Sequence, residues 1–286
     1  MSRSTTRNRQ VLGRIGARSG LAVALFGVLA LVLGPYIVML LTSLTPTDEL
    51  IGAGASIIPS RITFDAYVEL LGSTPFLTYM GNSLTVAAIA VPLTLVVSTG
   101  AAIAMSRFDF WGRRATMTGL LLAQMFPAVL LVISLSGQLR TFGLLDSEVG
   151  LALVHAAFAT PFATWLLKGF ADSLPRELEE AGQIDGASTS QVIRLLLLPL
   201  LLPGMVAAGT YAFILTWNEF LYALTFTSST DTRTLPVGLH LFIGEYQIRW
   251  DLLTAGGVLA VVPVLIGFLI VQKRLVAGMA AGAVKG

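Results

Sequence analysis

Six long apolar stretches, separated by short polar segments, dominate the chain. They cover residues 21–41, 76–105, 115–136, 149–167, 200–226 and 252–271. They contain 19 to 30 residues, and an α-helix needs roughly 20 to cross the hydrocarbon core of a bilayer. The segments between them carry prolines or charges, as in residues 45–49, 107–114 and 228–234. The pattern predicts an all-α membrane protein with six transmembrane helices, for which the lipid bilayer is the surrounding medium.

The composition excludes several classes of protein. Hydrophobic residues make up 55% of the 286 and charged residues only 12%, whereas a soluble domain is about a quarter charged. The chain has no cysteine and two histidines, which excludes disulfides and thiolate chemistry and disfavours a multi-histidine metal site. The basic residues are scattered in short runs, so nucleic acid is not an expected partner. We therefore do not expect a water-soluble fold.

The distribution of basic residues predicts the orientation. Fourteen of the eighteen lysines and arginines lie in the N-terminal tail, in alternate connecting segments and in the C-terminal tail, and basic residues are retained on the cytoplasmic side. The first apolar run is too long for the core of a signal peptide and lacks a cleavage site after it. We expect cytoplasmic tails at residues 1–19 and 273–286 around a six-helix domain at residues 20–272.

One cytoplasmic segment, residues 170–198, is long enough to have structure of its own. Ser173 is placed to cap a first short helix, which begins with Pro175 and three glutamates near the positive end of its dipole. Gly186 is expected to end that helix. The segment therefore predicts a short acidic helix on the cytosolic surface.

A second helix is expected to follow at once. Ser188 and Gln191 have the spacing of a capping box. The helix continues into an apolar stretch that Pro199 and Pro203 are expected to halt. Together the two elements predict a helix-turn-helix hairpin that is continuous with the fifth span.

The hairpin resembles the EAA loop of ABC importer permeases. Seven residues match that pattern: Glu180, Ala181, Asp185, Gly186, Ala187, Pro199 and Pro203. Gly182 and Gln183 stand where alanine is common, and a glycine there is expected to soften the first helix by up to about 1 kcal/mol. The resemblance implies that the loop is the coupling helix seated in a cleft of the ATPase, with contacts from Glu180, Ala181, Asp185, Gly186, Ala187 and Ser188.

Three further segments, residues 217–220, 124–127 and 276–286, are similar to the smaller permease subunit of maltose-type carbohydrate importers. The resemblance implies the type I ABC importer permease fold in a bacterial inner membrane. It also implies three partners: a homologous second permease, a cytoplasmic ATPase dimer and an extracytoplasmic solute-binding protein. The expected cargo is a sugar, with glycerol phosphate or another small polar solute of the same family as the alternative. Lys285 and Gly286 are expected to reach toward the ATPase.

The chain has no phosphate-binding loop of its own. Such a loop needs glycines followed by lysine and serine or threonine, and none of the three lysines, Lys168, Lys273 and Lys285, lies in such a run. We therefore expect no cofactor on this chain and no enzymatic activity, with ATP and Mg²⁺ bound by the partner ATPase.

Two other classes of membrane protein would need different residues inside the spans. An ion-coupled secondary transporter would keep ionisable residues inside its spans, and the candidates are His155 and Glu219. A hydrogen-bonded histidine between helices is favoured over a proton relay. A membrane-embedded enzyme would need convergent catalytic groups, but Ser83 beside Asn82 has no base at hand.

Candidate pathway residues follow from the chemistry of sugar recognition, which combines an aromatic face with amide and carboxylate hydrogen bonds. Trp217, Asn218 and Glu219 supply these groups together, and Asn82 and Gln124 are further amides inside spans. Polar residues in membrane helices more often join helices than bind ligands. In the resembled family, substrate contacts can lie mostly in the other permease.

Overall fold

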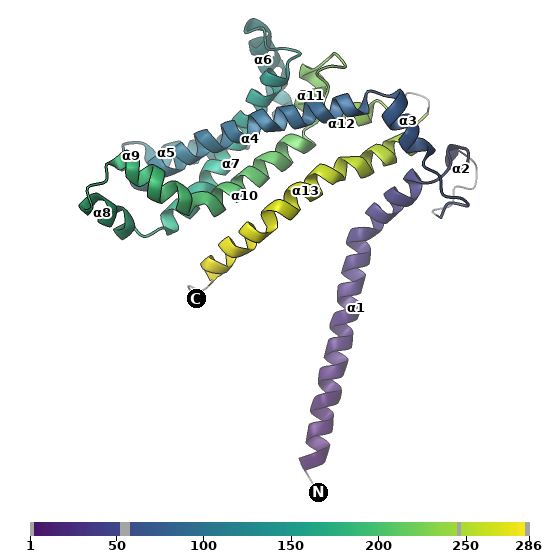
Figure 1. Ribbon diagram of the computed structural model, residues 1–286, viewed down its shortest axis with the longest axis horizontal. Helices are drawn as coiled ribbons and strands as arrows, with labels where there is room; N and C mark the ends of the chain where they lie inside the picture. The colour runs from purple at the N-terminus through teal and green to yellow at the C-terminus, as the bar shows by residue number, and fades with distance from the viewer. Residues whose placement is uncertain (1–2, 52–57, 245–246, 284–286) are drawn as a thin grey trace. The chain divides into compact units, whose positions relative to one another are not determined.

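A computed structural model describes residues 3–51, 58–244 and 247–283, and most of them are helical (Figure 1). Within these residues the β pairing is limited to an isolated bridge between Ile243 and Ile248. The chain forms two compact units. The first comprises Met1–Ser73 and Phe242–Leu259, and the second comprises Thr74–Leu241 and Ala260–Gly286.

The first unit contains α1 (Arg3–Ser43), α2 (Thr47–Ile51), α3 (Asp65–Ser73) and the beginning of α13 (Trp250–Ala283). Arg249 joins these elements, because its guanidinium pairs with Glu69 and with Asp251 at 2.8 Å each. Thr47 donates a further hydrogen bond to Asp251 at 2.9 Å. Asp251 is therefore buried with its charge compensated, as a buried carboxylate requires.

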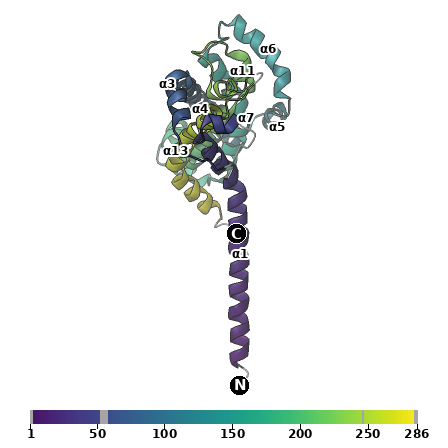
Figure 2. The same cartoon turned by 90° about the vertical axis from the view of Figure 1, so that its right-hand side faces the viewer.

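The second unit is built on α4 (Phe76–Arg107), α7 (Glu148–Ser173) and α10 (Leu198–Asn218), which run side by side (Figure 1, Figure 2). Small residues line their contacts, and Ala102, Ala163 and Ala208 are fully buried around Leu167. Small side chains let membrane helices approach closely, because lipid supplies no hydrophobic force to drive them together. The three helices thus form the core that positions the site.

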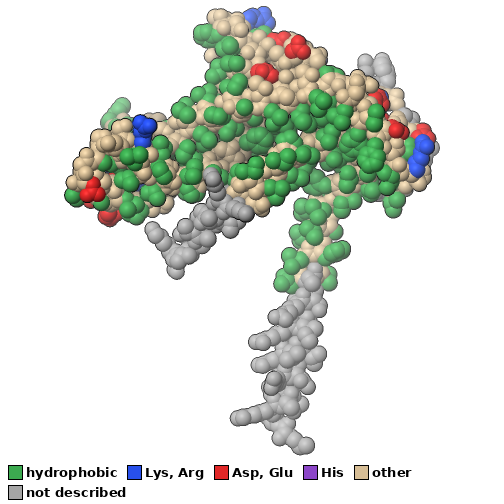
Figure 3. Space-filling view, in the orientation of Figure 1, with side chains coloured by type: hydrophobic (Ala, Val, Ile, Leu, Met, Phe, Trp, Pro, Cys, Tyr) green, Lys and Arg blue, Asp and Glu red, His purple; other side chains and the backbone are tan. Residues whose placement is uncertain are grey.

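The predicted membrane character is confirmed. Among the described residues, five helices are long and apolar enough to span a bilayer, and a bent pair of helices makes a sixth candidate. Hydrophobic side chains cover much of the visible helices, and charged ones lie toward their ends (Figure 3). In the part of α13 that belongs to the second unit, five apolar side chains are more than half exposed: Leu265, Ile266, Phe268, Leu269 and Ile270. Such a surface is stable only against lipid or another apolar chain.

The third predicted span is bent rather than continuous. It consists of α5 (Arg113–Ala123) and α6 (Ala128–Thr141), which meet at 98°. Pro127 explains the break: it has no N–H to donate, and its ring excludes helical geometry at the preceding residue. Pro127 is at φ −59° and ψ 121°, outside the helical region, directly before α6.

The prediction that Pro199 and Pro203 halt the helix is wrong. A π-helical segment, η1 (Val192–Leu197), lies directly before Pro199, and α10 continues through both prolines. The wider turn of a π segment accommodates a residue that cannot join the regular hydrogen-bond ladder. The fifth span instead ends at Asn218, earlier than expected, and a separate short helix, α11 (Leu221–Phe226), follows it.

Candidate coupling hairpin and polar sites of the helical core

The predicted hairpin is present between α7 and α10. Its first helix is α8 (Glu177–Ile184) and its second is α9 (Thr189–Gln191), which runs directly into η1 (Figure 1). Gly186 ends the first helix as predicted, with φ +88°, a left-handed conformation that favours glycine. The N–H of Ala187 bonds to the carbonyl of Gly182, and the N–H of Gly186 bonds to that of Gln183, both at 3.0 Å. These two bonds form a Schellman motif and fix the turn.

The predicted capping box at the second helix is confirmed. Ser188 donates its backbone N–H to the side-chain oxygen of Gln191 at 2.8 Å, and its hydroxyl accepts from the backbone N–H of Gln191 at 3.4 Å. Both ends of the turn are therefore held by local hydrogen bonds, which gives the exposed tip a defined shape.

The predicted cap at Ser173 is wrong. Ser173 is the last residue of α7, and its hydroxyl donates to the carbonyl of Phe170 at 2.7 Å. Leu174 is extended, as expected for a residue before proline. The chain then turns into α8 at Arg176, which caps the helix without a side-chain hydrogen bond. The acidic first turn of α8 is as predicted.

Gly182 has a different role from the expected softening of the helix. A Cβ at this position would lie 2.8 Å from Cδ1 of Leu196 and 3.6 Å from Cγ2 of Val192. The absence of a side chain lets α8 lie directly against η1. The glycine therefore serves the packing of the two arms of the hairpin.

The tip of the hairpin is open to a partner. Of the predicted coupling residues, Ala187 is half-buried and the other five are exposed. The first helix, all of which the structure describes, buries none of its own residues. Ile184 is 86% exposed beside the acidic side chains. This exposed isoleucine outside the apolar spans was not predicted, and the signal was a large apolar residue directly before Asp185 at the end of an acidic helix.

Asn82 and Ser83 are both buried and hold the loop at residues 230–235. The Asn82 amide donates to the backbone carbonyl of Arg233 at 2.9 Å and to that of Thr230 at 3.4 Å. The Ser83 hydroxyl accepts from the N–H of Leu235 at 2.8 Å, where α12 (Leu235–His240) begins. These contacts satisfy backbone groups that would otherwise be unpaired in an apolar setting.

Gln124 and Asn218 are the exposed amides among the candidate pathway residues. Gln124 lies at the bend between α5 and α6 and donates to the carbonyl of Phe158 at 3.1 Å. Asn218 donates to the carbonyl of Ile214 in its own helix at 2.8 Å. Each retains an amide oxygen that can accept a hydrogen bond from a solute.

Trp217 is 4% exposed and stacks on Phe213, with ring centroids 5.6 Å apart. Its ring packs within the described core, so it presents no free face for a sugar ring. The candidate pathway residues Asn82, Gln124, Trp217, Asn218 and Glu219 do not hydrogen-bond one another in the part of the chain that the structure describes.

Glu219 and His155 form a buried pair that the sequence analysis did not connect. Nε2 of His155 lies 3.2 Å from Oε2 of Glu219, and His155 is 1% exposed. The carboxylate also accepts from the backbone N–H groups of Tyr222 at 2.9 Å and Ala223 at 3.0 Å. Glu219 therefore closes the first turn of α11, and the favoured interpretation of His155 as a hydrogen-bonded histidine between helices is confirmed.

Two further features are a possible metal site and the predicted contact of the C-terminal residues with the ATPase. Within the described residues no group of three or more histidine, cysteine or acidic side chains is placed to hold a metal ion. The predicted contacts of Lys285 and Gly286 lie outside the described residues.

Comparison with known proteins gives consistent matches. The family model of the binding-protein-dependent transport system inner membrane component matches residues 94–281. The diacetylchitobiose uptake system permease protein DasC of Streptomyces coelicolor is 34% identical over 97% of this chain and 99% of its own. The trehalose transport system permease protein SugB of Mycobacterium tuberculosis is 36% identical over 85% of this chain and 89% of its own.

The fold has a solved counterpart. A chain from a bacterial ABC transporter involved in the import of the acidic polysaccharide alginate superposes with a TM-score of 0.75. The match covers 93% of this chain and 97% of that chain, at 24% identity.

Proposed function

Because the chain belongs to the family of binding-protein-dependent transport system inner membrane components, we propose that it lines a translocation pathway together with a homologous second permease. The chain is a transport subunit of an ABC importer and not an enzyme. A separate cytoplasmic ATPase dimer binds ATP and Mg²⁺ and supplies the energy. An extracytoplasmic solute-binding protein delivers the solute.

The observation that carries the coupling role is the exposed, locally fixed hairpin. Its turn is held by the Gly186 Schellman motif and the Ser188 capping box, so its shape does not depend on packing against the spans. Glu180 and Asp185 offer negative charge, and Ile184 offers an apolar side chain that is 86% exposed. A buried apolar anchor surrounded by polar contacts is the usual composition of an interface hot spot. The hairpin thus fits a partner cleft with an apolar floor and a basic rim.

The proposed topology places both tails and the hairpin in the cytoplasm. Fourteen of eighteen basic residues then lie on the cytoplasmic side. The boundaries are those of the sequence prediction, with tails at residues 1–19 and 273–286. Lys285 and Gly286 would approach the ATPase from the C-terminal tail.

The proposed cargo is a disaccharide or a similar small saccharide. The relatives named above carry diacetylchitobiose and trehalose in their names. Gln124 and Asn218 are the candidate residues whose exposed amides remain able to bind a polar solute, whereas Asn82, Trp217 and Glu219 are engaged within the core. Most sugar contacts would then lie on the second permease. Uptake of glycerol phosphate in place of saccharides by the reconstituted complex would favour the alternative cargo.

The assembly can be tested by purification in detergent with the products of the neighbouring genes. Wild-type protein is expected to bring down a second permease and an ATPase. The double variant Glu180→Lys and Asp185→Lys is expected to keep the permease and lose the ATPase, because charge reversal opposes a basic rim. The matched control is Asp48→Lys with Asp231→Lys, the same charge change at exposed positions outside the hairpin.

The outcomes discriminate between an ABC importer and an ion-coupled carrier. Loss of the ATPase in both double variants would remove the assignment to the hairpin. A wild-type chain that purifies alone and transports without ATP would overturn the proposal in favour of an ion-coupled carrier.

A further inference from the structure

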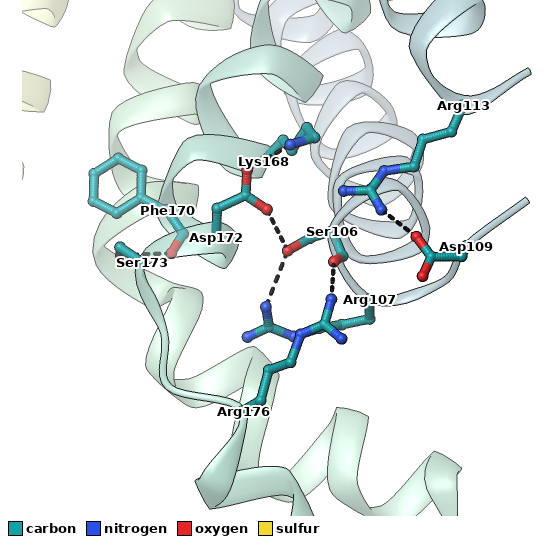
Figure 4. A network of polar contacts seen from close by, with 9 residues as sticks. All are labelled: Ser106, Arg107, Asp109, Arg113, Lys168, Phe170, Asp172, Ser173 and Arg176. Atoms are coloured by element: carbon teal, nitrogen blue, oxygen red, sulfur yellow. Dashed lines mark hydrogen bonds and ion pairs between the residues drawn. The ribbon is translucent and has the colours of Figure 1, made fainter.

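A network of polar side chains joins the end of α4 to the start of α8, and Figure 4 draws all of its members except Glu179. We call it the basal network, and its members are Ser106, Arg107, Lys168, Asp172, Arg176 and Glu179. They come from the last turn of α4, the last turns of α7 and the beginning of the hairpin. The network therefore lies where α8 leaves the three-helix core.

Arg107 is the centre of the network. Its Nε forms an ion pair with Oε1 of Glu179 on α8, and these side chains are only 8% and 16% exposed. Its two terminal nitrogens donate to the hydroxyl of Ser106 at 3.0 Å and to the carbonyl of Leu174 at 3.2 Å. One guanidinium thus binds α4, the linker and α8 together, which the planar, multiply donating Arg side chain does better than Lys.

The hairpin also contacts α4 through Arg176, the residue that precedes α8. Arg176 donates to the backbone carbonyl of Ser106 at 3.2 Å, one of the carbonyls at the end of α4 that lack a partner within the helix. The Ser106 hydroxyl donates to Asp172 at 2.7 Å, and Lys168 holds the other oxygen of Asp172 at 2.5 Å. Helices α4, α7 and α8 are therefore joined in one connected set of polar contacts.

This network matters because α8 has little other attachment to the core. The helix buries none of its residues, all of which are described. Its packing partner is η1, across Gly182. Along the chain, a displacement of α8 reaches α10 only through the turn at Gly186 and the π-helical segment. The basal network is the direct path from α8 to α4.

We propose that Arg107 is a positioning residue of the coupling hairpin, which holds α8 on α4 so that a displacement of α8 by the ATPase also moves α4 and α7. The proposal rests on the proposed coupling role of the hairpin for its functional consequence. Its structural part, the attachment of α8 to α4, stands by itself. At its opposite end, α4 holds the loop at residues 230–235 through Asn82 and Ser83, so a movement of this helix would be passed to that loop.

The attachment is tested first by a distance measurement, because the chain has no native cysteine. Spin labels are placed on the full-length chain at Gln183→Cys on α8 and Val97→Cys on α4, both at exposed positions. We expect a narrow distance distribution for the otherwise wild-type chain and a broad one for Arg107→Gln. The matched control is Arg113→Gln, which removes an arginine from an exposed ion pair with Asp109 nearby and should leave the distribution narrow.

The functional arm uses the complex with its ATPase in lipid nanodiscs or proteoliposomes. Arg107→Gln is expected to retain the ATPase but to transport roughly tenfold less solute per ATP, the scale of a typical coupling free energy between sites. The exchange of charges in Arg107→Glu with Glu179→Arg should restore part of the loss. Arg113→Gln should transport as the wild type does.

Each result has a defined meaning. If Arg107→Gln gives the same distances as Arg113→Gln, the attachment is wrong, whatever happens to transport. If distances broaden but transport per ATP is unchanged, Arg107 holds the hairpin without contributing to coupling, and the proposal fails. If Arg107→Gln does not fold, Glu179→Gln removes the same ion pair from the hairpin side and is judged by the same criteria. If no ATPase binds the wild type, the proposed function fails while the distance result still stands.

Discussion

The two ends of the helical core in the second unit each carry a pair of polar side chains, and the two pairs hold different elements. At one end, Arg107 contacts Glu179 and fixes the start of α8. At the other, His155 contacts Glu219 and fixes the start of α11. Both pairs lie where the chain leaves the α4, α7 and α10 core, a place where helix ends leave unpaired backbone groups.

The elements held by the two pairs differ in burial. In α11, Tyr222, Ala223 and Phe226 are buried, and Tyr222 stacks on Phe158 with ring centroids 5.0 Å apart. In α8, whose residues are all described, none is buried. The pair of His155 and Glu219 therefore supports a continuation of the core, and the pair of Arg107 and Glu179 supports an element that projects from it. A substitution in the His155 pair should act on stability, and one in the Arg107 pair should act on coupling.

The largest stability effect is expected for Glu219→Ala. The substitution leaves His155 buried without its partner and removes the acceptor of two N–H groups of α11. Each buried hydrogen-bonding group left without a partner costs about 1–3 kcal/mol, and three such groups lose their partner here. The variant should therefore unfold at markedly lower denaturant in detergent, followed by tryptophan fluorescence. Asp109→Ala, in an exposed pair with Arg113, should cost less than about 1 kcal/mol. Equal losses of stability in Glu219→Ala and Asp109→Ala would contradict the expected difference between these two pairs.

The fold could be predicted from apolar length and the membrane constraint, but the effect of each proline could not. Pro127 breaks the third span, whereas Pro199 and Pro203 lie inside a continuous helix. All three remove a backbone donor and add a ring clash. Pro199 follows the widened turns of η1, whereas Pro203 lies within the regular helix of α10. The effect of each proline therefore depends on the packed structure rather than on the local sequence.

The candidate site was predictable where its bonds are local. The Gly186 turn and the Ser188 capping box involve residues within five positions of each other, so their spacing identifies them. The pairing of His155 with Glu219 spans 64 positions, and the contact of Arg107 with Glu179 likewise crosses from one span to the hairpin. Such pairs depend on how the helices pack, which periodicity does not specify.

A moderate effect is expected at Asp146, outside the spans. Burial would raise the pKa of Asp146, but hydrogen bonds from the Ser228 N–H, the Thr232 hydroxyl and the Ser229 N–H outweigh it and hold this pKa below its usual range. The group therefore contributes stability that is full above its unfolded pKa of about 4 and is lost as pH falls below it toward the folded pKa.

Asp146→Asn removes the negative charge of this side chain but keeps its backbone conformation and one oxygen acceptor. Asparagine tolerates the left-handed backbone at φ 56° and keeps an oxygen acceptor, so the loss at neutral pH should be about 1 kcal/mol, the difference between charged and neutral hydrogen bonds. The fall in unfolding midpoint between about pH 5 and pH 3 should be shallower than in the wild type. The exposed control Asp231→Asn should retain the wild-type fall. A wild-type pH dependence in Asp146→Asn would show that this carboxylate is not its source.

The smallest effect distinguishes two interpretations of Gly182. If glycine only softens α8, Gly182→Ala should stabilise the hairpin by up to about 1 kcal/mol through helix propensity. The close approach of Leu196, 2.8 Å from the position of a new Cβ, opposes that gain. We expect the two terms nearly to cancel in stability, while α8 shifts away from η1 and less ATPase is recovered by purification. Gln183→Ala is the matched control, because its side chain is exposed on the same helix, and it should keep full recovery. Faster hydrogen exchange of the hairpin amides in Gly182→Ala, but not in Gln183→Ala, would show that the shift occurs in the hairpin. Slower exchange with full recovery of the ATPase would instead support the interpretation that glycine only softens α8. The close packing of α8 against η1 would then not be the role of this glycine.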